Sequence, residues 1–122
     1  MTATAAQSPD PLADLRPNYA ERLRARVAGL SAFLQEARQG NLAEFAVSEN
    51  HRCVHSMISS AAIFGHPELS RAARVAEQAF EQRTQQGDRP LISSIEALLL
   101  TADDVLNVYQ TPNIGPLEPA AR

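Results

Sequence analysis

Two of the three histidines, His51 and His55, lie four residues apart in the stretch HRCVHSMISSAAIFG. In a helix this spacing places both imidazoles on one face. A helical wheel puts His55 about 160° from Met57, on the outer face beside the small residues Ser59 and Ala62. Small neighbours leave room for a large partner to reach the ring. His55 is therefore a candidate nucleophile presented to another macromolecule.

Other interpretations of the histidines stay open. His55 can be an ordinary solvated histidine on a polar helix face. The spacing of His51 and His55 also suits a shared metal ion, but the run H-R-C-V-H lacks the H-E-x-x-H form and Cys53 points inward. Two ligands without a third do not make a site, so no metal site is predicted. His66, before Pro67, is expected to cap or abut a helix.

The composition limits the classes of function. The chain has 122 residues, of which 44% are hydrophobic and 20% charged, which suits one folded domain. All eleven basic residues are arginine, so lysine chemistry is excluded. A net charge of −3 without a basic stretch argues against nucleic-acid binding. The single cysteine forms no internal disulfide, and neither a signal peptide nor a membrane span is indicated, so the expected location is cytoplasmic.

Hydrophobic periodicity predicts four long helices. Leu23, Val27, Leu30 and Leu34 alternate steps of four and three, as in a helix-bundle seam. Short joints, GN, GHP and GD, place successive helices side by side and antiparallel. The predicted fold is all-α, an up-down antiparallel four-helix bundle over residues 12–110, with tails at 1–11 and 111–122. The helices are expected at about 17–39, 42–64 (capped by Asn41), 66–86 and from Asp88 onward, with a short extra helix near 11–16.

The run from His55 to Gly65, HSMISSAAIFG, resembles the signature of histidine-containing phosphotransfer (HPt) domains of two-component phosphorelays, roughly H-x-L-K-G-S-A-x-x-F/L-G. In this resemblance His55 matches the phosphoacceptor and Met57 stands for the leucine. The resemblance covers about residues 17–110. Further matching positions are Ser60, Ala61, Phe64, Gly65, Leu69, Ala73 and the pair Ala76-Glu77.

Two residues depart from the family pattern. Ile58 stands where the family has a lysine, and Ser59 stands where it has a glycine. In the family that lysine looks like an electrostatic support for the phosphorylated ring, so its loss weakens attraction to an anionic phosphoryl group. Ser59 is still small, and its hydroxyl could donate to a phosphoryl oxygen. Arg52, one turn before His55, is a candidate replacement for the charge.

The resemblance implies a phosphocarrier without kinase activity or an ATP site of its own. The partners would be receiver domains of response regulators, with a hybrid sensor kinase as a further candidate. His55 would attack the phosphorus of a receiver's phosphoaspartate, while the Mg²⁺ would belong to the receiver, so no cofactor is expected on this chain. Ile58, Ala62 and Phe45 are candidates for an apolar docking patch. A monomer is expected.

Three rival classes can be distinguished. An HPt-like module that binds a receiver or another signalling protein without transfer is the strongest, and Ile58 is its best argument. A structural or oligomerisation bundle is the second. A sensor-kinase dimerisation helix fits poorly, because the residues after His55 do not resemble H-E-x-x-x-P.

Overall fold

The computed structural model describes residues 10–121, including the side chains of residues 10–109. Within this range every regular element is a helix, which confirms the all-α prediction. Residues 1–9 of the expected N-terminal tail lie outside the described part. The helices are α2 (Arg16–Arg38), α3 (Glu44–Ile63), α4 (Pro67–Glu81), α5 (Arg83–Gln86) and α6 (Arg89–Ala121).

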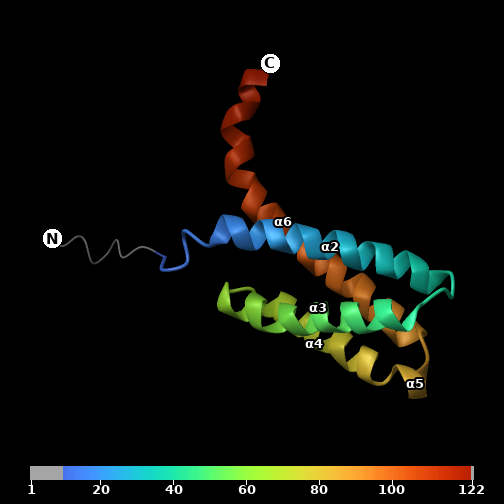
Figure 1. Ribbon diagram of the computed structural model, residues 1–122. Coiled ribbons are helices and arrows are strands. Elements are labelled where there is room, and N and C mark those ends of the chain that lie inside the picture. The colour runs from blue at the N-terminus through green and yellow to red at the C-terminus, as the bar shows by residue number, and fades with distance from the viewer. Residues whose placement is uncertain (1–9, 122) are drawn as a thin grey trace.

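The helices pack around one shared core. Helix α3 lies against α4, α4 against α6 and α6 against α2, while α2 makes a smaller contact with α3 (Figure 1). Each fully buried leucine or methionine contributes about 1.5–3 kcal/mol relative to an exposed one. The largest fully buried side chains come from all four long helices: Leu23, Leu30, Val54, Met57, Leu69, Leu91, Ile95 and Leu98.

Helices α3 and α4 approach each other over small residues. Ala61 of α3 and Ala73 and Ala76 of α4 are completely buried, and small side chains shorten the distance between helix axes. The Ser70 hydroxyl donates a hydrogen bond of 2.8 Å to the carbonyl oxygen of Ile58 across this contact. The outer rims of α3 and α4 are therefore close enough for their longer side chains to meet.

Glycines end the helices where the sequence places them. At the end of α3 the Gly65 N–H donates to the Ala62 carbonyl (3.2 Å) and the His66 N–H donates to the Ala61 carbonyl (2.8 Å). This is the Schellman pattern, which needs a left-handed residue. Gly65 provides it with a φ of 84°. The chain consequently reverses within three residues and begins α4 at Pro67.

Several predicted boundaries were wrong. Helix α3 begins at Glu44 rather than Leu42, so the N-cap position falls on Ala43 and Asn41 does not cap the helix. The Asn41 N–H instead bonds back to the Glu36 carbonyl (2.9 Å). The third predicted helix is interrupted at Gln82, which separates α4 from α5. Residues 11–15 form turns rather than a helix. The Asp10 carboxylate accepts the Leu12 N–H there (3.0 Å).

The last helix continues beyond its predicted end. The prolines and glycine of TPNIGPLEPAAR predicted a tail at 111–122, whereas α6 extends to Ala121. A proline inside a helix removes one hydrogen bond and bends the axis without always ending it. Figure 1 accordingly shows the red end of α6 turning away from the other helices. Among the described residues, no helix is long and apolar enough to cross a membrane.

Two glycine substitutions should change stability in opposite directions. Gly65→Ala puts a Cβ on a left-handed residue and should lower the free energy of unfolding by about 1–2 kcal/mol. Gly29→Ala lies inside α2, where an added Cβ meets no atom within 4 Å, and should raise it by about 0.5–1 kcal/mol. Urea denaturation of both variants measures this. A Gly65→Ala variant as stable as wild type would contradict the assigned joint.

Candidate functional site

His55 is exposed but held by a neighbouring helix. Its side chain is 71% exposed, and Nδ1 pairs with the Oε2 atom of Glu77 on α4. Glu77 is much better protected, with a side chain that is 17% exposed. When the Glu77 carboxylate accepts the Nδ1 proton, the neutral ring carries its lone pair on Nε2. The site thus orients one imidazole and leaves Nε2 as the nitrogen available to a partner.

His51 occupies a different environment on the same face. Its ring stacks on Phe80 of α4, with centroids 5.2 Å apart and planes within 3°. Its Nε2 lies 3.9 Å from Oε2 of Glu81. Both histidines therefore point toward the α4 rim, as predicted for a shared face, but the packing fixes His51 against an aromatic ring. Of the two, His55 is the one presented outward.

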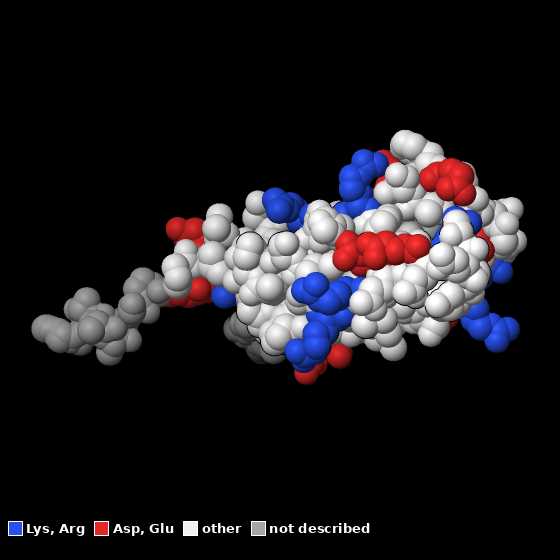
Figure 2. Space-filling view, turned by 90° about the horizontal axis from the view of Figure 1, so that it is seen from below, with Lys and Arg blue, Asp and Glu red and all other residues white. Residues whose placement is uncertain are grey.

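A shallow hollow of about 260 Å³ lies beside His55. Its lining residues are Ser48, His51, Arg52, His55 and Glu77. The predicted neighbour Arg52 is exposed, and its guanidinium supplies positive charge on the rim of this hollow. Figure 2 shows the molecule from below, where α3 and α4 lie in Figure 1, with a band of acidic atoms near the centre of this face and basic side chains beside it.

The other predicted residues divide into two groups. Ser59 and Ala62 are exposed, so the small side chains predicted beside His55 do lie on the surface next to it. Ile58 is instead half-buried and packs against the core, which makes it less available to a docking partner. Phe45 is 72% exposed, as expected, and Ile63 at 62% is an exposed apolar residue that the sequence analysis missed. On the wheel both lie about 80° from His55, on the same side.

The two glutamates of α4 that meet the histidines, Glu77 and Glu81, had no predicted role. Glu77 entered only as one half of a matching pair, and Glu81 was not considered. A signal was present, because Glu77 and Glu81 repeat on α4 the spacing of four that separates His51 and His55 on α3. That spacing alone does not say which histidine meets which glutamate, and the structure supplies this register.

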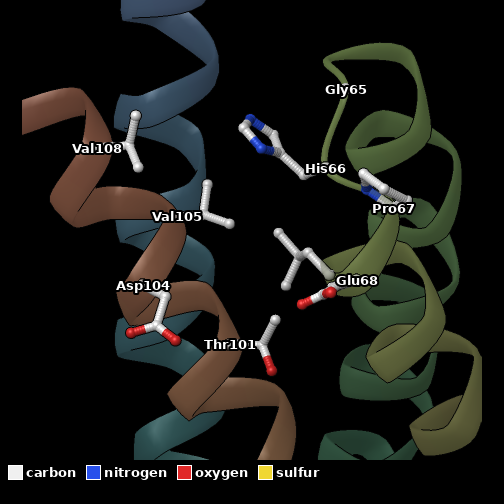
Figure 3. Close-up of a pocket in the computed structure, with 9 residues that line it drawn as sticks. Gly65, His66, Pro67, Glu68, Thr101, Asp104, Val105 and Val108 are labelled. Atoms are coloured by element: carbon white, nitrogen blue, oxygen red, sulfur yellow. The ribbon is translucent and has the colours of Figure 1, made fainter.

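A second, larger cleft lies at the start of α4. It measures about 390 Å³, and Figure 3 shows His66 on one wall with Thr101, Asp104, Val105 and Val108 of α6 on the other. His66 precedes α4 without a side-chain capping bond, and its Nε2 lies 2.9 Å from the Tyr109 hydroxyl. Burial, with a smaller contribution from Arg16, lowers the pKa of His66.

The surroundings of His66 indicate a structural role. Arg16 donates to the Phe64 carbonyl (3.0 Å) and to the Tyr109 hydroxyl (3.3 Å), which ties the start of α2 to this joint. Tyr19 stacks on Phe64 with centroids 4.3 Å apart, and burial raises the pKa of Tyr19 to about 12. His66 therefore abuts its neighbours, as the sequence predicted, and the exposed His55 remains the candidate site.

Comparison with protein-family models, curated proteins and solved structures found no match for this chain. The geometry around His55 is therefore the structural basis for assigning a function.

The Glu77 contact predicts the tautomer of His55. In wild type the neutral ring should carry its proton on Nδ1, because the carboxylate accepts it. Glu77→Ala removes this acceptor and should shift the proton toward Nε2. ¹⁵N chemical shifts of the imidazole nitrogens above pH 8 measure the change, with Glu68→Ala on the same helix as the control. Equal tautomer populations in wild type and Glu77→Ala would contradict the assignment.

Proposed function

We propose that this chain is a phosphocarrier of the HPt type, which receives a phosphoryl group on His55 from the phosphoaspartate of a receiver domain and passes it to another. One observation carries the proposal: a largely exposed imidazole is oriented through Nδ1 by a protected carboxylate on the adjacent helix. The sequence resemblance from His55 to Gly65 supports it independently.

The proposed transfer needs one nucleophilic atom from this chain. Nε2 of His55 attacks the phosphorus in line, the N–P bond forms, and the bond from phosphorus to the aspartyl oxygen breaks and leaves the receiver's carboxylate. The ring gains positive charge in this step while Nδ1 keeps its proton. The negative charge of Glu77 offsets that gain, and the reverse step returns the phosphoryl group to a receiver.

The surroundings of His55 fit a docked domain better than a small substrate. The hollow is shallow, and Ser59 and Ala62 leave space above the helix. Exposed Phe45 and Ile63 offer apolar contact on one flank of His55, and Arg52 offers charge toward a phosphoryl oxygen. The Mg²⁺ of the reaction belongs to the receiver in this proposal, so the chain acts without a cofactor and is not an enzyme.

The proposal also covers the arrangement of the helices, the oligomeric state and the cellular location. We propose that the four long helices form the up-down antiparallel bundle of HPt domains, that the chain acts as a monomer, and that it works in the cytoplasm. A hybrid sensor kinase is a further candidate partner, through its receiver domain.

Phosphotransfer tests the proposal directly. The full chain is incubated with ³²P-labelled phosphorylated receiver domains, and acid-labile, base-stable label on the chain is measured. Wild type and His51→Gln should both accept label, whereas His55→Gln should not, because only His55 presents its ring outward. The proposal fails if a panel of receivers never labels wild type, or if His55→Gln accepts label as well as wild type.

Ile58 favours a second candidate, an HPt-like module that binds receivers without transferring phosphate. A half-buried aliphatic side chain stands where the family has a cation. Receiver binding without label on His55 would identify this function.

Restoring the cation should stabilise the phosphorylated form. Ile58→Lys should lengthen its lifetime roughly two- to fivefold, the size of one exposed ion pair. Ile63→Lys adds the same charge two turns away and should leave the lifetime unchanged. Decay of purified phosphorylated protein at pH 8 measures both. Equal lifetimes for Ile58→Lys and wild type would show that this position has no electrostatic role here.

A further inference from the structure

Three ligand atoms from two helices meet beside the proposed phosphoacceptor. One atom each of His51, Glu77 and Glu81 lies within 4.8 Å of the other two. On the sequence alone, His51 and His55 lacked a third ligand, so no metal site was predicted. The packing of α3 on α4 changes the set of available ligands, because it brings the carboxylates of Glu77 and Glu81 close to the imidazole of His51.

The surroundings hold two of the three ligands in place. The His51 ring is fixed by stacking on Phe80, and Glu77 is largely protected from solvent. Glu81 is more exposed, at 57%, with its Oε2 3.9 Å from Nε2 of His51. Ligand atoms around a tetrahedral ion at about 2.0–2.2 Å lie roughly 3–4 Å apart. The three ligand atoms lie up to 4.8 Å apart, so side-chain rotations must bring them slightly closer to surround an ion.

We propose that His51, Glu77 and Glu81 form a binding site for a divalent transition-metal ion such as Zn²⁺. One imidazole and two carboxylates match the donors that Zn²⁺ accepts, whereas Mg²⁺ and Ca²⁺ prefer oxygen donors alone. The two carboxylate charges balance the charge of the ion, and water completes the coordination. This site does not depend on the proposed phosphotransfer, since no ligand is His55.

The shared residue couples the ion to His55. Glu77 is both a ligand of the proposed site and the partner of Nδ1 of His55, and an ion on either carboxylate oxygen draws negative charge away from that contact. Binding of the ion should therefore weaken the contact between Glu77 and His55 and shift the His55 proton from Nδ1 toward Nε2. The ion would be a regulator of the exposed imidazole rather than a participant in a reaction.

Metal titration of the full chain tests the site. Co²⁺ binding is followed by visible absorption and Zn²⁺ binding by calorimetry, in a buffer that does not chelate. Wild type should bind one ion per chain. His51→Ala and Glu81→Gln should each weaken binding by at least about tenfold, the lower bound for changes around metal ligands. Glu68→Gln, an exposed glutamate of the same helix, should bind like wild type, and circular dichroism checks that every variant is helical.

Three further measurements decide whether His51 and Glu81 bind the ion and whether the ion affects His55. His55→Gln should keep the ion, and Zn²⁺ should shift the ¹⁵N signals of His55 in wild type but not in Glu81→Gln. Wild-type affinity in both His51→Ala and Glu81→Gln would overturn the site, and so would loss of binding in His55→Gln alone. Because the titration uses no phosphate donor, a failed phosphotransfer leaves this result unaffected.

Discussion

The close packing of α3 on α4 is the constraint on which the candidate site depends. Buried alanines on both helices and the bond from Ser70 to the Ile58 carbonyl hold the two helices together. At this distance a glutamate side chain can reach across the rim, so Glu77 meets His55 and Glu81 lies near His51. On an isolated helix, His55 would be a freely rotating surface imidazole without a preferred nitrogen.

The contact between His55 and Glu77 is expected to bias the tautomer of His55 without immobilising the site. A hydrogen bond to a charged group contributes about 1.5–3 kcal/mol in a protected setting, and less where solvent screens it. Since 1.4 kcal/mol is a factor of ten, a contact of this size shifts the tautomer balance toward Nδ1–H, and screening by solvent reduces the shift. Glu77 can consequently orient His55 and still be drawn away by a competing cation, which places the same carboxylate in both proposals.

Helix periodicity and glycine positions made the all-α class and most of the helices predictable. Apolar residues repeat with the helical period, and glycine follows the ends of α2 and α3 because the chain reverses there in the left-handed conformation. Residues that commonly cap helix N-termini predicted the helix starts less reliably. Asn41 has the chemistry of a cap, but its N–H takes part in closing the preceding helix. The end of α6 was missed because proline indicates a bend or an end, and the sequence does not distinguish the two.

The outward direction of His55 was predictable from one helix, whereas its partner was not, because the register between two helices depends on packing along their whole length. Ile58 is an example of a residue whose environment depends on this register. The wheel places Ile58 and Arg52 on opposite flanks of His55, about 120° apart, and only the structure shows which flank faces a neighbour. Ile58 lies on the packed side, where an aliphatic chain gains burial, and Arg52 lies on the solvent side. Ile58 therefore strengthens the helix contact that orients His55, and the positive charge of Arg52 lies on the opposite flank.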